Sequence, residues 1–297
     1  MTVRISVVIP TYNLEEVACR TLASVLSQTS LPDEILIADD GSTDRTLALV
    51  QEAVRGTPAG LVRILPGPHR GPGATRNRGI QEATGDWVSF LDGDDLWLPA
   101  KMERLRSAIA THPEADIIAH DEFEIGLDGI QQYKPLHQYF DRARPLLTQL
   151  YRGCFLSTSC VAVRARTLRE AGSFDEELGS AQDFDLWLRL ARRSNLHFIP
   201  EPLEIYVLRK NNISSDLPLR YQCLRTIAFR HAPYLAPLVG RRMARKMQFH
   251  FLAMAQMHLI IGMIRSGRWV RTAALGLTCI SDLARGFCGT VGETGLR

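Results

Sequence analysis

Residues 3–13 read VRISVVIPTYN, a near-continuous run of β-branched residues that stops at a proline and a short polar turn. A run without strict alternation of apolar and polar residues is typical of a strand that is buried on both faces. Residues 15–28 follow with apolar side chains at helical spacing, and 34–38 (EILIA) form a second apolar run. This order of strand, helix and strand predicts a parallel sheet.

The alternation continues beyond the first strand pair, so the sequence predicts an α/β protein with a Rossmann-like α/β/α sandwich. Ligands of such sheets bind beyond the carboxyl ends of the strands. Ser42 is a suitable N-cap for the second helix. We expect further strands at 61–65, 87–91, 116–119 and 160–164, and helices at 44–54, 74–84, 101–111, 182–193 and 241–264.

The composition is that of a globular protein. Of 297 residues, 45% are hydrophobic and 23% charged, which excludes a disordered, collagen-like or coiled-coil chain. The longest apolar stretch, 251–264, contains Gln256 and His258, so a membrane-spanning helix is not expected. The six cysteines form no CxxC pair and are interpreted as reduced thiols of a cytoplasmic protein.

Charge is distributed unevenly along the chain. Residues 1–216 carry 23 Lys and Arg against 30 Asp and Glu, whereas residues 217–297 carry 12 against two. Two parts with opposite net charge suggest two roles. We therefore expect a catalytic domain at 1–216 and a basic, amphipathic helical extension at 217–297, in which Met243, Met247, Phe251, Met254 and Ile261 share one helix face.

Three carboxylates stand within the four residues 92–95 (DGDD), directly after a predicted strand. Oxygen ligands without a nearby histidine or cysteine suit Mg²⁺ or Mn²⁺. A surface turn is the alternative interpretation of any single Asp-Gly-Asp. Here apolar residues flank the motif on both sides, which favours a metal-binding loop.

Two further loops follow predicted strands. The segment 39–44 (DDGSTD) fits a plain turn and a contact with a nucleotide equally well. The segment 71–77 (GPGATRN) leads into a helix, where Arg76 and Arg78 could face phosphate. In nucleotidyltransferases a similar glycine loop follows the first strand, and here it does not.

The helix expected at 182–193 begins with two acids, Asp183 and Asp185. They point roughly 200° apart on a helix, so only one can face the acidic loop. An interaction with the helix dipole is the alternative role for either carboxylate.

Taken together, these segments resemble glycosyltransferase family 2, the inverting nucleotide-sugar transferases with the A-type fold. The resemblance covers residues 3 to about 215 and follows the order of the family. Its segments are ISVVIPTYN (5–13), DEILIADDGSTDRT (33–46), GATRNRGI (73–80), GDWVSFLDGDDLW (85–97), CVAVRARTLREAGSFDEEL (160–178) and QDFDLWLRL (182–190).

The resemblance implies a role for each matching residue. The residues assigned to the nucleotide sugar are Pro10, Tyr12, Asn13, Asp39, Asp40, Arg76, Asp92 and Arg209. It makes Asp94 the main ligand of Mg²⁺ or Mn²⁺ and Asp183 the catalytic base. Arg209 belongs to a lid-like segment, 206–215. Two departures stand out: Gln182 replaces the usual acid before the base, and Lys210-Asn211-Asn212 occupies the place of a frequent histidine.

The expected activity is metal-assisted transfer of a sugar from a nucleoside-diphosphate-sugar donor to an acceptor hydroxyl, with inversion, in cell-surface polysaccharide or glycolipid synthesis. Residues 1–100 would bind the donor and 101–216 a carbohydrate or lipid-linked acceptor; no feature indicates a nucleic acid or sets an oligomeric state. The alternative is a non-catalytic nucleotide-sugar-binding or scaffold protein, which Gln182 favours. The basic extension either covers the catalytic domain or attaches it peripherally to the anionic cytoplasmic face of a membrane, through 241–246 and Arg265, Arg268 and Arg271.

Overall fold

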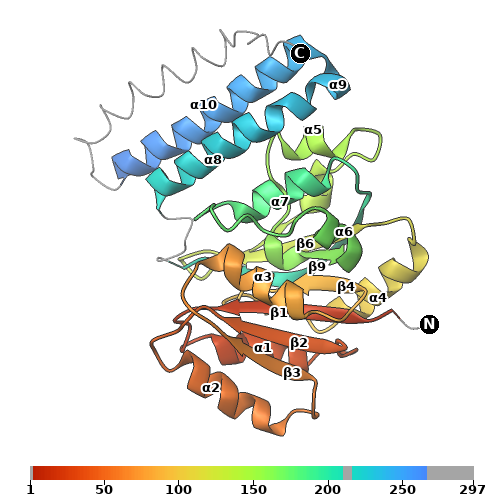
Figure 1. Cartoon of the computed structure of the whole chain (residues 1–297), viewed down its shortest axis with the longest axis vertical. Coiled ribbons are helices and arrows are strands. Elements are labelled where there is room, and N and C mark those ends of the chain that lie inside the picture. Colours follow the sequence, from red (N-terminus) through yellow and green to blue (C-terminus); the bar gives the residue numbers. More distant parts are fainter. Residues whose placement is uncertain (1–2, 210–215, 266–297) are drawn as a thin grey trace, which may run out of the picture. The chain divides into compact units, whose positions relative to one another are not determined.

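The computed structural model describes residues 3–209 and 216–265. The chain divides into two compact units, one formed by residues 1–150 and 154–212, the other by 151–153 and 213–297 (Figure 1). Part of the lid-like segment, 210–215, lies outside the described residues, as do Arg268 and Arg271.

The first unit alternates strands and helices in its amino-terminal half, as the apolar runs predict. Its strands are β1 (Ile5–Thr11), β2 (Glu34–Asp39), β3 (Val62–Pro66), β4 (Trp87–Phe90), β5 (Leu96–Trp97), β6 (Ile117–Ile125), β7 (Gln131–Lys134), β8 (Val161–Arg164) and β9 (Leu196–Val207). Its α-helices are α1 (Ala18–Leu26), α2 (Thr46–Ala53), α3 (Pro72–Glu82), α4 (Lys101–Thr111), α5 (Leu146–Leu150), α6 (Ala165–Glu170) and α7 (Gln182–Leu190).

These strands form one mixed sheet in the order β3-β2-β1-β4-β8-β6-β9-β5, and β7 pairs with β6. The strands β3, β2, β1 and β4 are parallel, and β8 runs antiparallel to both of its neighbours. Parallel pairing brings the carboxyl ends of β1, β2 and β4 to one edge. The α/β class expected from the sequence is confirmed.

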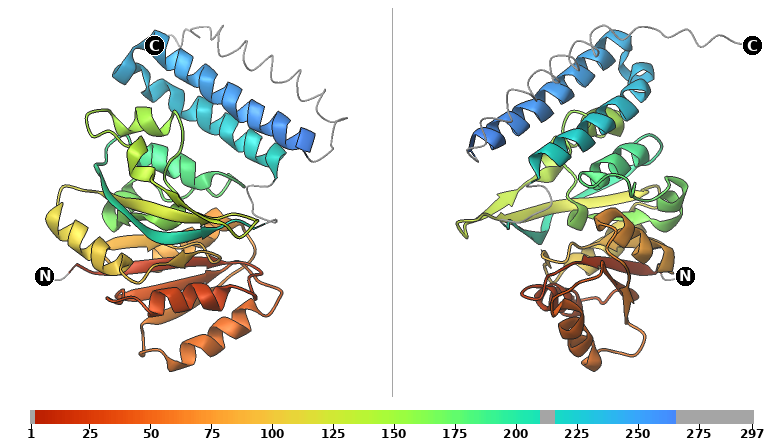
Figure 2. Two further views of the ribbon diagram at one scale, coloured as in Figure 1. Left: turned by 180° about the vertical axis from the view of Figure 1, so that it is seen from behind. Right: turned by 60° about the vertical axis from the view of Figure 1, so that its left-hand side comes forward.

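Helices cover both faces of the sheet. On one face, α1, α2 and α4 bury Leu22, Val50 and Met102 against Val7 and Ile37 of the strands. The opposite face carries α3 and α7, which lie on the near side of the sheet in Figure 1 and behind it in the left view of Figure 2. This second face positions the functional side chains of α3 and α7.

The helix α3 lies close to β1 because of Gly79. A Cβ at this position would be 2.5 Å from Cγ1 of Val8, so glycine permits the approach. On the same face, the Phe90 ring of β4 lies edge-on to Phe174, with centroids 5.5 Å apart. The close contact of Gly79 with Val8 sets the distance between α3 and β1.

One local expectation is wrong. Ser42 does not cap α2, which begins at Thr46; its hydroxyl donates to Asp39 instead, at 2.6 Å. The strand expected at 116–119 is longer than predicted, since β6 continues to Ile125 and pairs with β7.

The second unit is helical in its described part. It contains α8 (Leu217–His231), α9 (Ala236–Val239) and α10 (Arg241–Arg265), and α8 and α10 lie side by side in both figures. Tyr221 of α8 packs against Ala255, Leu259 and Met263 of α10. The expected helix at 241–264 is confirmed.

The predicted methionine face of α10 is not its buried face. Met247 and Phe251 are buried, but Met243 and Ile261 are 44% and 40% exposed. The buried positions are Ala244, Met247, Phe251, Leu252, Ala255, Leu259 and Met263. The packed face therefore contains small alanines as well as large residues. The positions of the methionines alone do not predict it.

By length and composition, α10 is also the one helix of the described residues that could cross a membrane. Of its most apolar stretch, 33% is buried. Core helices of soluble proteins have the same length and composition, so these features alone do not assign α10 to a membrane.

Candidate active site

Three strand ends form the floor of the candidate site. Thr11 ends β1 and Asp39 ends β2, and these two residues are directly paired in the register. Asp92 follows β4, the other neighbour of β1, by two residues. The two acidic segments expected at strand ends therefore meet on either side of β1.

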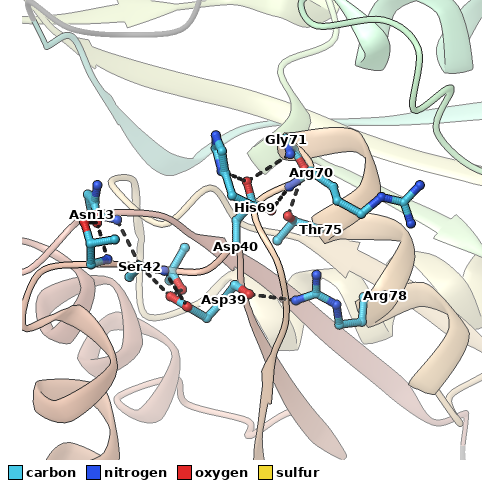
Figure 3. Close-up of polar contacts among 11 residues, drawn as sticks. Asn13, Asp39, Asp40, Ser42, His69, Arg70, Gly71, Thr75 and Arg78 are labelled. Carbon is cyan, nitrogen blue, oxygen red and sulfur yellow. Dashed lines mark hydrogen bonds and ion pairs between the residues drawn. The ribbon is translucent and has the colours of Figure 1, made fainter.

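The Asp39 carboxylate is used within the loop. It is buried and accepts hydrogen bonds from the hydroxyls of Thr11, at 3.0 Å, and Ser42, at 2.6 Å (Figure 3). The backbone N–H of Ser42 also donates to it, at 2.9 Å. Asp39 thus fixes the loop after β2.

Asp40 binds the segment that leads into α3. Its carboxylate accepts hydrogen bonds from the backbone N–H groups of Arg70 and Gly71, at 2.9 and 3.0 Å, and lies 2.7 Å from Nδ1 of His69 (Figure 3). The His69 ring stacks on Tyr12, with centroids 4.2 Å apart. Tyr12 is 42% exposed and offers an aromatic surface beside two predicted binding residues.

Asn13 holds the turn after β1. Its φ is 50°, in the left-handed region that asparagine tolerates better than most residues. The side-chain oxygen of Asn13 accepts a hydrogen bond from the backbone N–H of Thr43, at 2.9 Å. The backbone N–H of Asn13 donates to the hydroxyl oxygen of Ser42. Pro10 lies in β1 opposite Ala38, two residues before Tyr12.

The two arginines of α3 have different surroundings. Arg78 donates to the carbonyls of Asp39 and Leu65, at 2.7 and 3.1 Å, and so fastens α3 to the ends of β2 and β3 (Figure 3). It does not remain free for phosphate. Arg76 is buried and donates through Nη2 to Asp92.

Arg76 is the cation at the centre of an acidic cluster. Burial opposes its charge, but Asp92 and, more weakly, Asp183 and Asp94 raise its pKa overall. Its Nε and Nη1 atoms have no hydrogen-bond partner among the described residues, and its guanidinium lies 5.5 Å from the centre of the Phe174 ring. Two buried donors therefore remain available beside three carboxylates.

Asp94, in the same loop, is a partly buried carboxylate whose charge is opposed by its surroundings. Burial, and next the neighbouring Asp92 carboxylate, raise the pKa of Asp94 to about 6, against the opposing effect of Arg209. Arg209 lies 3.9 Å from Asp94 and 3.8 Å from Glu16. Asp92 is paired with Arg76, whereas Asp94 has, among the described residues, only the more distant Arg209 as an ion-pair partner, so Asp94 suits a divalent cation, which takes one or two carboxylate ligands together with phosphate oxygens.

Asp95, the third acid of this loop, forms hydrogen bonds with residues outside the loop. It is buried and accepts hydrogen bonds from the Ser159 hydroxyl, at 2.7 Å, and from the backbone N–H of Val207, at 3.1 Å. Ser159 also accepts from the backbone N–H of Asp92. Asp95 therefore joins the acidic loop to β9, close to Arg209.

The two acids at the start of α7, Asp183 and Asp185, have different surroundings. Asp185 is fully buried and pairs with Arg189, at 2.8 Å. Asp183 is partly exposed, accepts a hydrogen bond from Thr158, at 3.1 Å, and interacts electrostatically with Arg76. Gln182 is buried, and its Oε1 has no hydrogen-bond partner among the described residues.

The structure brings Arg76, Asp92, Asp94, Asp183 and Arg209 into one electrostatically connected cluster, while Tyr12, Asp40 and His69 form a second group. Sequence reasoning missed His69, because a lone histidine after a proline carries no signal by itself. It also missed the linking role of Asp95, which depends on Ser159 and Val207, 64 and 112 residues away in the chain.

Comparison with known proteins identifies the family. The model of glycosyl transferase family 2 matches residues 6–171, more than half of the chain. The chain belongs to glycosyltransferase family 2. A curated relative, the amylovoran biosynthesis glycosyltransferase AmsB of Erwinia amylovora, is 32% identical over 213 residues, which cover 68% of each chain.

Solved structures of glycosyltransferases share this fold. Residues 1–349 of TarS from S. aureus, in complex with UDP-GlcNAc, match with a TM-score of 0.73 at 20% identity, over 95% of this chain and 81% of that one. The mannosyltransferase PcManGT of Pyrobaculum calidifontis, in complex with GDP-Man and Mn²⁺, matches with a TM-score of 0.62 at 18% identity, over 99% and 89%. The expected A-type fold with a helical carboxyl-terminal region is confirmed.

The family 2 chain is shorter than several relatives. It spans 54% and 62% of the lengths of two other curated relatives, both uncharacterized glycosyltransferases, from Nostoc and Rickettsia typhi. The family model matches residues 6–171, and the assignment of activity and substrates is a separate proposal.

Proposed function

We propose that this chain is an inverting glycosyltransferase that transfers a sugar from a nucleoside-diphosphate-sugar donor to an acceptor hydroxyl. The observation that carries the proposal is Arg76, a buried cation with two free donors between Asp92 and Asp183. A departing diphosphate needs such a positively charged, preorganised partner. A non-catalytic binding protein would not need a second carboxylate, that of Asp183, near enough to interact electrostatically with this cation.

The donor fits the two groups of side chains. Tyr12 and His69 provide an aromatic surface for the nucleobase, beside the loop that Asp39, Asp40 and Asn13 hold. Arg76 and Arg209 would contact the diphosphate, and Asp92 the sugar or ribose. The UDP-GlcNAc and GDP-mannose complexes of the two structural neighbours support a donor of this class.

Asp183 is the proposed base. In the reaction the acceptor hydroxyl loses its proton to the Asp183 carboxylate while its oxygen bonds to the anomeric carbon. The bond from that carbon to the diphosphate oxygen breaks, and the nucleoside diphosphate leaves with the electron pair. A single displacement inverts the anomeric carbon and requires no covalent nucleophile.

Asp94 would hold Mg²⁺ or Mn²⁺. The ion, when bound, supplies positive charge for the diphosphate oxygens. The fit is supported by the carboxylate chemistry of the loop and by burial and the neighbouring Asp92, which raise the pKa of Asp94 to about 6. Arg209 remains close enough to share the same phosphate oxygens.

For the acceptor we propose a chemical class, and for the enzyme a location in the cell. The name of AmsB, which includes amylovoran biosynthesis, supports an acceptor in the synthesis of a cell-surface polysaccharide or glycolipid. We assign the donor to residues 1–100 and the acceptor to 101–216. Residues 217–297 are proposed to attach a cytoplasmic enzyme to the anionic face of the membrane.

Release of nucleoside diphosphate from a panel of UDP-, GDP- and dTDP-sugars, with and without Mn²⁺, tests the proposal. We expect one donor to be hydrolysed slowly without acceptor, in a metal-dependent reaction that Arg76→Ala abolishes. Tight donor binding without any release, with acceptor extracts present as well, would establish the non-catalytic alternative.

A further inference from the structure

Three buried side chains of different chemistry meet inside the first unit, beside Asp95 of the acidic loop. His120 belongs to β6, Cys160 directly precedes β8, and Glu204 belongs to β9, three strands that are neighbours in the sheet. Their ligand atoms all lie within 4.8 Å of one another. The proposed transfer reaction uses none of them.

The orientation of His120 leaves one ring nitrogen free. Its Nδ1 lies 2.7 Å from the backbone carbonyl of Asp121, so this nitrogen carries the proton and donates. The other nitrogen, Nε2, then presents a lone pair, and it has no hydrogen-bond partner among the described residues. A backbone carbonyl that fixes the tautomer in this way is typical of histidines that bind metal through Nε2.

Glu204 is the second group without a regular hydrogen bond. It is fully buried, and neither carboxylate oxygen accepts one within the described part of the chain. The Lys101 ammonium and the Cys160 thiol are its electrostatic neighbours. Burial raises the pKa of Glu204 well above its ordinary value and also raises that of the Cys160 thiol.

The groups around these three side chains are mostly acidic. The Cys160 thiol donates to Glu122, whose oxygen lies 3.3 Å from Sγ and is a candidate fourth ligand. Lys101 is the neighbouring cation; its Nζ donates to the carbonyl of Ser159 and lies 3.9 Å from the centre of the Trp97 ring. The buried Asp95 carboxylate also interacts electrostatically with Lys101 and Glu204, so the acidic groups outnumber the one ammonium and favour a cation.

We propose that His120, Cys160 and Glu204 bind a structural Zn²⁺ ion, with Glu122 completing the tetrahedron. Zinc combines nitrogen, sulfur and oxygen ligands, whereas Mg²⁺ and Mn²⁺ favour oxygen. Bond lengths of about 2.0–2.3 Å place the ligand atoms of a tetrahedral site roughly 3.3–3.8 Å apart, which small side-chain rotations achieve here. The ion would join β6, β8 and β9 below the acidic loop and would be distinct from the metal of Asp94.

Metal content and cobalt spectroscopy of the full-length chain test this site. Protein purified from zinc-supplemented cells, in reducing buffer, should retain about one zinc ion per chain after gel filtration. Replacement of zinc by Co²⁺ should produce a thiolate-to-cobalt charge-transfer band in the near ultraviolet. Cys160→Ser should lower zinc retention by more than about tenfold and remove the band.

Cys223→Ser is the matched control, since Cys223 is also a buried free cysteine but belongs to the second unit. It should keep both the zinc and the band. A wild-type protein without zinc and without the cobalt band overturns the proposal, whatever the folding of the variants. Undiminished zinc in a folded Cys160→Ser protein overturns it equally, because the ion would then lie elsewhere.

Discussion

At the scale of single residues, Arg76 and Arg78 show how two positions on one helix, about half a turn apart, carry a functional and a structural arginine. Arg78 satisfies carbonyl groups at the ends of β2 and β3, and this interaction fastens the helix. Arg76 keeps two buried donors without partners. Buried unpartnered donors are costly in a folded protein, so their retention indicates a ligand. The sequence suggests phosphate contact for both arginines, and only Arg76 is assigned to the nucleotide sugar.

Asp94→Ala should abolish metal-dependent nucleotide binding and turnover. The substitution removes the proposed main ligand of the ion, and folding should persist because the loop carboxylate is not part of the apolar core. Calorimetric titration with a nucleoside diphosphate, with and without Mn²⁺, measures the effect. Asp128→Ala, in an exposed turn, is the control and should bind normally. Near-normal activity of Asp94→Ala in metal-free buffer contradicts the assignment.

Asp183→Asn should lower kcat by at least ~10²-fold while donor affinity changes little, because the amide keeps the size of the side chain but accepts no proton. Steady-state kinetics with the identified donor provide the measurement. Asp185→Asn is the matched variant on the same helix. It should retain the chemistry but lose about 1–3 kcal/mol of stability, because it weakens the buried pair with Arg189. The reverse pattern would assign the base to Asp185.

At the scale of elements, the parallel half of the sheet is predictable from sequence because its strands are short apolar runs. The strand β9 was missed, since Pro200 and Pro202 interrupt its pattern and proline is rare inside sheets. The pairing of β6 with β9 shifts register around Asp121, opposite Pro202, and this irregularity accommodates the prolines. The strand β5 has only two residues, too few for any periodicity.

The candidate site shows the same limit. Acids directly after strands could be predicted, because the chain order places them at one edge of the sheet. The meeting of His120, Cys160 and Glu204 could not, because it depends on the order β8-β6-β9, which no local pattern encodes.

Gly79→Ala tests the contact between α3 and β1. The added methyl group would overlap with Val8, and we expect a loss of about 1–2 kcal/mol even though alanine favours helix. Urea unfolding measures the change. Gly56→Ala is the control, because its Cβ would meet no atom within 4 Å, and it should leave stability unchanged or slightly raised. Equal stability of the Gly79 variant and the wild type would show that α3 and β1 leave room for the added methyl group.

At the scale of the whole molecule, the uneven charge of the sequence corresponds to a difference in surface chemistry. The described helices of the second unit expose several large apolar side chains: Phe229, Tyr234, Leu238, Met243, Phe249, Met257, Ile261 and Ile264. Arg241, Arg242, Arg245 and Lys246 are exposed on the first turns of α10. Basic and apolar side chains on one helix are typical of attachment to an anionic membrane surface.

Full-length protein should therefore cosediment with vesicles that contain anionic phospholipid, but not with neutral vesicles. Each basic side chain near such a surface contributes about 1 kcal/mol, so replacing the four residues 241, 242, 245 and 246 by glutamine should weaken binding by at least about 10²-fold. Glutamine at Arg55, Arg144 and Arg166, which are exposed on the first unit, should have little effect. Added salt should also weaken binding, because exposed charges are screened. Equal recovery in the supernatant with anionic and neutral vesicles at low salt would leave the basic helices with a purely structural role.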